Sequence, residues 1–345
     1  MSPLPPTPTP TPTPMANPAA PPKTSSGFGL LFALAATSGL AYIWPTTTLG
    51  WDPFLLPSTM LLGLVAATMF CLGMVVHMEE LQELRERPAC VLLGVAVQCT
   101  LMPGLAWLAI QLLGLSGDLA YGIVLVGCVP GAMASNVLTM TARGNVSYSV
   151  SLTTVATLLS PLTVPLALTV VGGITATPAA FQPGRTAWLL LLTVVLPVVL
   201  GFLFKRQFSL AQALARRAAP QIATLALLWI IASVVAANRE RLAQIQSSML
   251  LALAIINLLG YVGGWAAGLA ARMPQSMRRA LSLEVGMQNA GLGTALAASL
   301  FGGDSAAQIP TAAYTFGCML SGTLLAWTWR RMATRTAALG LVPDG

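Results

Sequence analysis

Long apolar runs recur along almost the whole chain and are separated by short polar connections. Each run holds about 20 residues, the length that a helix needs to cross a hydrocarbon core of about 30 Å. The pattern therefore predicts an all-α polytopic membrane protein with ten transmembrane helices, at residues 27–44, 54–77, 88–113, 119–142, 146–173, 186–204, 219–237, 248–271, 278–301 and 309–330.

The first 26 residues, "MSPLPPTPTPTPTPMANPAAPPKTSS", form a Pro/Thr repeat with one lysine and no apolar run. This composition is typical of an extended, solvated segment, and it lacks both the apolar centre of a secretory signal and the Arg-rich character of a transit peptide. We predict a disordered tail over residues 1–26, a transporter domain over 27–332 and a short cytoplasmic tail over 333–345.

The composition excludes an ordinary soluble domain, because 56% of the residues are hydrophobic and only 8% are charged, against about 25% charged in soluble proteins. If both termini are cytoplasmic, all but three of the 17 basic residues lie on the cytoplasmic side, the exceptions being Arg185, Arg239 and Arg241. The positive-inside rule predicts this asymmetry. The net charge of +7 therefore indicates orientation in a membrane and gives no reason to expect a nucleic acid partner.

Glu284 is the one acidic residue of the ten that falls inside an apolar run. A charge at membrane depth costs at least about 2.5 kcal/mol and marks a functional site by default. The alternative is a glutamate near a helix end that is neutralised by Arg278 or Arg279. Glu284 is followed by "VGMQNAG", in which Gly286 and Gly291 flank two polar amides, so we predict that the ninth helix is broken here.

A second break is predicted in "GCVPGAMASN", because Pro130 lacks a backbone donor and Gly131 loosens the turn. Ser135 and Asn136 then supply polar side chains. A Pro-Gly kink that only shapes packing is the alternative. The breaks fall in the fourth and ninth helices, which are equivalent positions if residues 27–173 and 186–332 are two inverted five-helix repeats. Interrupted helices at corresponding places in inverted repeats indicate the binding site of a transporter. Polar residues in the third and eighth helices, Gln98 and Asn257, support this pairing.

Three segments resemble the bile acid:sodium symporter family, including its bacterial and plastid members. They are "VAVQCTLMPGLAW" (95–107), "GCVPGAMASNVLTMTARGNVSYSVSLTTVATLLSPLTVP" (127–165) and "LSLEVGMQNAGLGTALAASL" (281–300). The resemblance extends from about residue 28 to 330. It implies core and panel domains, broken helices four and nine that cross near the midplane, and sodium-coupled symport of an organic anion by alternating access. The anion would be bile-acid-like, pantoate or a 2-oxo acid.

The resemblance also implies two sodium sites that share Glu284, with Na⁺ as the coupling ion and no other cofactor. Hydroxyl, amide, carbonyl and carboxylate oxygens suit a hard cation. The first site comprises Ser135, Asn136, Ser149, Thr153 and Glu284. The second comprises Gln98, Glu284, Val285, Met287 and Gln288, with Val285 and Met287 acting through their backbone carbonyls. Ser149 and Thr153 share a helical face, but hydroxyls that only bond to the preceding turn are the alternative for these two.

The substrate is expected where the half-helices begin, because freed N–H groups and the positive end of the helix dipole suit a carboxylate. The family implies contact at Asn289, and the expected pocket comprises Met133, Ala134, Asn289, Ala290 and Cys318. Met133 replaces a threonine found in some bacterial members, and Cys318 and Met319 replace a His-Asn pair. The expected pocket is therefore more apolar than in those relatives.

Two other function classes stay open. A proton-driven or sodium-independent exporter of anions or metalloids could use Cys128, although the five cysteines show no metal or disulfide spacing and suit apolar packing. A membrane hydrolase would need paired acids or a histidine cluster, so the protein is not expected to be an enzyme.

Gly260, Gly264 and Gly268 predict a face for close helix packing. We expect a monomer in a bacterial inner membrane with both termini cytoplasmic, or alternatively in a plastid envelope, with sodium, a small organic anion and lipid as its partners.

Overall fold

The computed structural model describes residues 27–44, 49–76, 78–175, 181–208, 218–242, 245–302 and 305–338. The predicted N-terminal tail and residues 339–345 lie outside these ranges. Within the described part of the chain every regular element is helical and no strand forms. The prediction of an all-helical chain is therefore confirmed.

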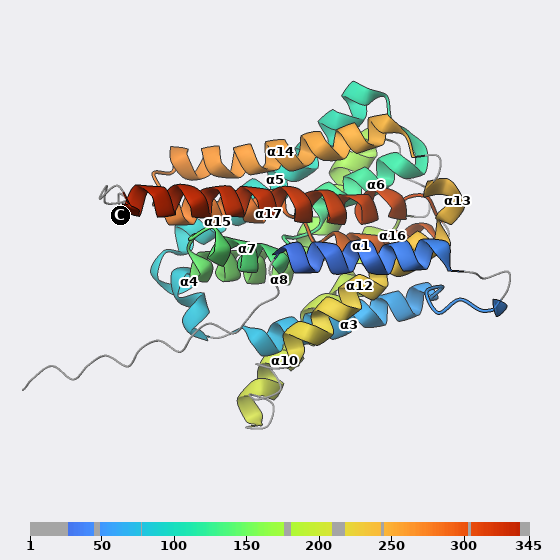
Figure 1. Ribbon diagram of the computed structural model, residues 1–345, viewed down its shortest axis with the longest axis horizontal. Coiled ribbons are helices and arrows are strands. Elements are labelled where there is room, and N and C mark those ends of the chain that lie inside the picture. The colour runs from blue at the N-terminus through green and yellow to red at the C-terminus, as the bar shows by residue number, and fades with distance from the viewer. Residues whose placement is uncertain are drawn as a thin grey trace, which may run out of the picture.

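Seven helices in the described residues are long and apolar enough to cross a membrane. Figure 1 shows several of them running along the long axis of the molecule. They are α3 (Ser58–Val75), α5 (Pro88–Leu113), α8 (Val146–Thr175), the continuous run of α9 (Pro183–Leu190), the π-helical turn η2 (Leu191–Val195) and α10 (Leu196–Gln207), α12 (Ala219–Ala237), α14 (Ser247–Ala270) and α17 (Gln308–Ala338).

The other three predicted spans contain shorter helices. The first holds α1 (Gly27–Ile43), the fourth holds α6 (Gly117–Cys128) and α7 (Ala134–Thr141), and the ninth holds α15 (Gln275–Gly286) and α16 (Ala290–Phe301). Short helices also form at the connections, namely η1 (Met78–Leu81), α4 (Gln82–Glu86) and α13 (Arg239–Leu242). Both predicted breaks are thus present. At its C-terminal end, α17 continues to Ala338, so helix persists beyond residue 332, where the short tail was expected to begin.

Each break follows from its sequence. Pro130 has no N–H to continue the ladder of α6, and Val129 before it is extended, with φ −71° and ψ 154°, as expected of a residue that precedes proline. In the second break α15 ends at Gly286, and Met287 is extended with φ −115° and ψ 98°. Asn289 then caps α16, because its side-chain oxygen accepts a hydrogen bond from the Leu292 N–H at 3.1 Å.

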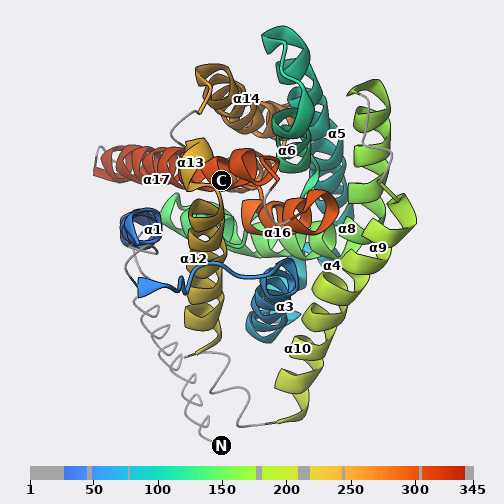
Figure 2. The same cartoon turned by 90° about the vertical axis from the view of Figure 1, so that its right-hand side faces the viewer.

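The helices pack in two groups that Figure 2 separates. The helices α3, α10 and α12 lie together in its lower part, with α1 against α12, while α5, α6 and α14 lie above the broken helices. Glycines allow close approach within each group. A Cβ on Gly73 of α3 would meet the Val198 carbonyl carbon at 2.8 Å, and a Cβ on Gly264 of α14 would lie 2.8 Å from the Leu281 carbonyl oxygen of α15.

The predicted packing face of α14 is confirmed by its three glycines. A Cβ on Gly260 would meet the Met102 sulfur at 2.9 Å, and one on Gly268 would meet the Arg278 side chain at 2.9 Å. The opposite face of α14 carries exposed leucine and valine side chains, including Leu258 and Val262, which are 57% and 62% exposed. An exposed apolar face of this kind suits contact with lipid tails.

Candidate functional site

The two breaks pair with each other through their backbones. Gly131 and Gln288 form an isolated antiparallel bridge. The Ala132 N–H donates to the Met287 carbonyl at 2.8 Å, and the Asn289 N–H donates to the Pro130 carbonyl at 2.7 Å. Backbone groups that lose their helical partners must find others when they are buried. Here each break satisfies the other, so the two unwound segments cross as one unit.

Glu284 lies directly at this crossing, on the last turn of α15, and its side chain is fully buried. Its carboxylate accepts hydrogen bonds from the hydroxyls of Ser135 on α7 and of Thr153 on α8, the latter at 2.5 Å. The Ser149 hydroxyl is a third donor, at 3.4 Å. Three hydroxyls from two other helices therefore converge on one carboxylate.

Neither neighbouring arginine neutralises Glu284. Arg279 donates to the Ala142 carbonyl at 2.9 Å, and the guanidinium of Arg278 lies over the ring of Trp265 at 5.1 Å from its centroid. No ion pair to Glu284 forms within the described ranges. The alternative in which a nearby arginine satisfies this acid is therefore contradicted by the structure.

The five residues predicted for the first sodium site form one hydrogen-bonded cluster. Asn136 completes it, because its side-chain oxygen accepts from Ser149 at 2.7 Å and from Thr153 at 3.3 Å. The Thr153 hydroxyl also donates to the Ser149 carbonyl of the preceding turn at 2.9 Å. The bond to the preceding turn, considered above as the alternative for this residue, therefore coexists with the contact to Glu284. Thr139, which no sequence pattern singled out, joins this cluster, because its hydroxyl donates to Ser149 at 3.3 Å.

Three of the residues predicted for the second site, Gln98, Gln288 and Val285, form a hydrogen-bonded chain. The Gln98 side-chain amide of α5 donates to the Gln288 side-chain oxygen at 3.3 Å, and the Gln288 amide donates to the Val285 carbonyl at 3.3 Å. The Gln98 side-chain oxygen is buried and accepts no hydrogen bond within the described part of the chain. A buried oxygen without a donor is the kind of group that a cation satisfies. Met287 belongs to this set through its carbonyl, which takes part in the crossing.

Gly131 is a further residue of the site that was singled out only as a helix breaker. A Cβ built at this position would overlap the Glu284 carboxylate, meeting its Oε1 and its carboxyl carbon. Glycine is therefore required here for space, since no positive φ is recorded for it. The signal in the sequence was the Pro-Gly pair, but the identity of the group that fills the space could not be derived from it.

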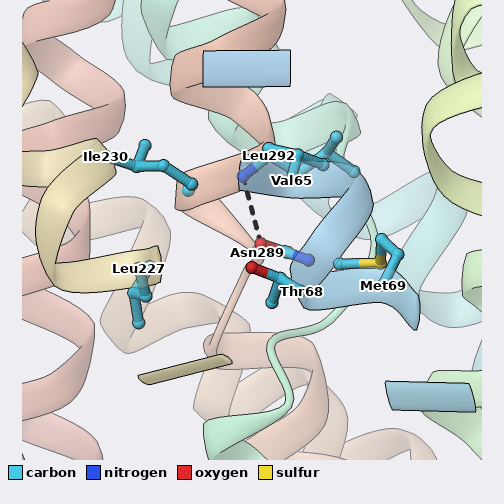
Figure 3. A pocket seen from close by; sticks show the side chains of 8 residues that line it. Val65, Thr68, Met69, Leu227, Ile230, Asn289 and Leu292 are labelled. Atoms are coloured by element: carbon cyan, nitrogen blue, oxygen red, sulfur yellow. Dashed lines mark hydrogen bonds between the residues drawn. The ribbon is translucent and has the colours of Figure 1, made fainter. Parts of the chain in front are cut away.

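Of the five residues expected at the substrate, only Asn289 lines the small pocket shown in Figure 3. Ala290 and Cys318 are buried elsewhere in the packing, whereas Met133 and Ala134 are half-buried, and none of these four lines that pocket. The remaining walls come from three helices, and only the two residues of α16 lie in a segment that the sequence singled out, 281–300. These walls are formed by Val65, Thr68 and Met69 of α3, Leu227 and Ile230 of α12, and Gly291 and Leu292 of α16.

In the described ranges no three His, Cys, Asp or Glu side chains gather in a group that could hold a metal ion. Cys128, the cysteine considered for metalloid export, is buried at the end of α6 and does not line the pocket in Figure 3.

Known proteins resemble this chain over most of its length. The model of the Sodium Bile acid symporter family matches residues 60–245. The protein named uncharacterized sodium-dependent transporter YocS, from Bacillus subtilis, is 35% identical over 282 residues, which cover 81% of this chain and 85% of YocS. The probable sodium/metabolite cotransporter BASS1, chloroplastic, of Arabidopsis thaliana is 29% identical over 90% of this chain and 75% of its own length. Its rice counterpart is 28% identical over 89% of this chain and 73% of its own length.

Proposed function

The chain belongs to the sodium bile acid symporter family, and on this premise we propose that it is a sodium-coupled symporter of a small organic anion. The observation that carries the proposal is the fully buried carboxylate of Glu284 at the crossing of the two broken helices. A buried ionised group is tolerated only with a compensating partner. Sodium ions held between this carboxylate and the oxygens around it would supply that partner.

The donor set suits sodium by chemical type. It offers hydroxyl, amide and carbonyl oxygens around one carboxylate, and it includes no thiolate or imidazole that would favour a softer metal. The cluster of Ser135, Asn136, Ser149 and Thr153 would form the first site, and the chain from Gln98 through Gln288 to Val285 would form the second. Glu284 would serve both, so binding at one site would be coupled to binding at the other through this carboxylate.

Transport would follow from the two packing groups. We assign α1, α3, α9 to α10 and α12 to a panel domain and the other long helices, with the two broken pairs, to a core domain. The chain would then have ten spans in two inverted repeats, as its pattern of apolar runs predicts. The pocket lies between α3 and α12 on one side and α16 on the other. Rocking of the panel against the core would expose this pocket to each side of the membrane in turn.

The pocket bears on the class of substrate. Its lining is mostly aliphatic, with Thr68 and Asn289 as its polar side chains, and it contains no basic residue. An anion there would have to be neutralised by the bound sodium and by the N-terminal end of α16, which Asn289 caps. A carboxylate with a small apolar body fits these walls, and pantoate, 2-oxo acids and bile acids are the candidates. We propose a monomer in a bacterial inner membrane with both termini in the cytoplasm.

The test is a proteoliposome screen of bile acids, pantoate, pyruvate and other 2-oxo acids, each with and without an inward sodium gradient. At least one carboxylate should accumulate only with the gradient. Glu284→Gln should insert normally and lose the sodium dependence, because it keeps the shape but removes the charge. Glu240→Gln, at an exposed position on α13, is the matched control and should transport like the native protein.

Two results would contradict the proposal. Sodium-driven uptake that is unchanged in Glu284→Gln would remove Glu284 from the coupling mechanism. A flux that is independent of sodium and abolished by Cys128→Ala would instead favour the exporter.

A further inference from the structure

One backbone carbonyl in the second break is held by two side chains from two other helices. The Gly286 carbonyl accepts hydrogen bonds from the Asn257 side-chain amide of α14 at 2.8 Å and from the Tyr314 hydroxyl of α17 at 2.8 Å. This carbonyl is one of those that the end of α15 leaves without a helical partner. Both of its lone pairs are used, whereas capping of a helix end needs only one donor.

The two donors are themselves fixed by a buried network. The Ser321 hydroxyl donates to the Asn257 side-chain oxygen at 2.6 Å, and Tyr261 lies 3.1 Å from the same hydroxyl. Asn257 and Tyr314 are 5% and 1% exposed. Buried polar groups are costly unless their partners are complete. We call Asn257, Tyr261, Tyr314 and Ser321 the capping network; its closed bonding leaves little freedom to Asn257 and Tyr314.

Gly286 needs this restraint because it has to be a glycine. A Cβ at this position would overlap the ring of Tyr261. Glycine turns about its backbone bonds more freely than any other residue, and the freedom must be lost when the structure is ordered. A glycine at the end of α15, where the break begins, is therefore a loose joint unless other groups hold its peptide planes.

The joint lies between two carbonyls that matter for the proposed function. Val285 and Met287 flank Gly286, and their carbonyls belong to the predicted second sodium site. The peptide plane that joins Gly286 to Met287 carries the Gly286 carbonyl, which accepts both hydrogen bonds. Fixing that plane sets the torsions on either side of it, and these torsions determine how the Val285 and Met287 carbonyls are oriented relative to each other.

We propose that Asn257 and Tyr314 are positioning residues for the second sodium site, acting through the Gly286 carbonyl without contacting the ion. The inference rests on the proposed function, because it assigns the capping network to one of the two sodium sites. It also predicts an asymmetry: the first site, built from side chains of α7 and α8 with Glu284, does not depend on the capping network.

The experiment measures binding of radiolabelled sodium to the purified full-length protein in detergent, with choline replacing sodium to hold the ionic strength constant. Tyr314→Phe removes one donor and keeps the ring. Loss of one buried hydrogen bond corresponds to an affinity change of about three- to tenfold, and this weakening should appear at one of the two sodium sites and leave the other unchanged. Adding Asn257→Leu, which is similar in shape, should weaken that site by a further factor of similar size.

Tyr148→Phe is the matched control, because its hydroxyl also donates to a buried carbonyl, that of Cys90, at 3.0 Å. It should leave the sodium affinity of both sites unchanged. A purely structural role for the capping network would lower the melting temperature without sodium but leave the sodium titration in place. If the double variant does not fold, the single Tyr314→Phe variant decides.

The outcomes separate the inference from the proposed function. If the native protein binds no sodium, the proposed function fails. If the native protein binds sodium and Tyr314→Phe binds it with the same affinity as Tyr148→Phe at both sites, the positioning role is overturned and the proposed function stands.

Discussion

Gly131→Ala tests whether the crossing of the two breaks controls the proposed sodium sites. The added methyl group would occupy the space of the Glu284 carboxylate, overlapping Oε1 and lying within 3.2 Å of Cγ. Oε1 is the oxygen that accepts the 2.5 Å hydrogen bond from Thr153. The backbone at residue 131 cannot move away freely, because both neighbours are hydrogen-bonded across the crossing, Pro130 to Asn289 and Ala132 to Met287. The carboxylate is therefore the group that has to move.

The magnitude follows from the hydrogen bond that is lost. A hydrogen bond to a charged group contributes about 1.5–3 kcal/mol, and about 1.4 kcal/mol corresponds to a tenfold change in affinity. Sodium affinity should therefore fall by about ten- to a hundredfold. Bound ligand at a hundred times its dissociation constant stabilises a protein by about 2.7 kcal/mol, so a tenfold loss should remove about half of the sodium-dependent stabilisation.

The assay is thermal unfolding of the purified protein across a sodium series at constant ionic strength. Gly104→Ala on α5 is the control, because no atom lies within 4 Å of a Cβ at that position and alanine favours a helix. Thr153→Val supplies a second check. If Gly131→Ala acts by breaking the bond between Thr153 and Glu284, the two changes together should weaken sodium binding by less than the sum of their separate effects. Full sodium-dependent stabilisation in Gly131→Ala would refute this reasoning.

Two further predictions concern the framework around the site. Gly264→Val should lower the melting temperature by several degrees, because a Cβ at Gly264 lies 2.8 Å from the Leu281 carbonyl oxygen and overpacking costs about 1–3 kcal/mol. Gly317→Ala is the control and should not lower it, because the space around its Cβ is open. Equal shifts in the two variants would contradict the close contact of α14 with α15. Asn145→Asp should destabilise the protein more at neutral pH than Asn145→Ala does, although aspartate is a good helix cap. The reason is that the Asn145 amide donates to the Glu83 carboxylate at 2.6 Å, and a second carboxylate there would repel the first. Adding Glu83→Gln to Asn145→Asp should restore stability, and failure to restore it would exclude the repulsion.

The sequence predicts the helices of this protein well because apolar length and helix-breaking residues are local properties. Pro130 and Gly286 indicated where the two helices end, and the structure ends them nearby, at Cys128 and Gly286. Local chemistry also distinguished Glu284 from the other acids, since no other acid lies within an apolar run. These predictions need no knowledge of which helices meet.

What could not be predicted depends on contacts between distant segments. The bond from Ala132 to Met287 joins residues that are far apart in the chain, and nothing local specifies it. Gln98 and Asn257 were paired as counterparts in the two halves, yet the structure places both against the second break, on Gln288 and on Gly286. The pocket walls from α3 and α12 were missed for the same reason, because apolar residues such as Val65 and Ile230 look like any others in a membrane helix.

The backbone pairing of the two breaks constrains how the proposed transport can work. The Pro130 and Met287 carbonyls accept hydrogen bonds across the crossing, and Ser135 of α7 donates to Glu284 of α15. Pulling the breaks apart would therefore leave several buried polar groups without partners at once. The crossing should therefore move as one body, and access should open where α16 meets α3 and α12. Asn289 belongs to both regions, since its N–H is bonded to Pro130 and its side chain lines the pocket (Figure 3). Sodium binding at the proposed sites would therefore change the binding of substrate through Asn289.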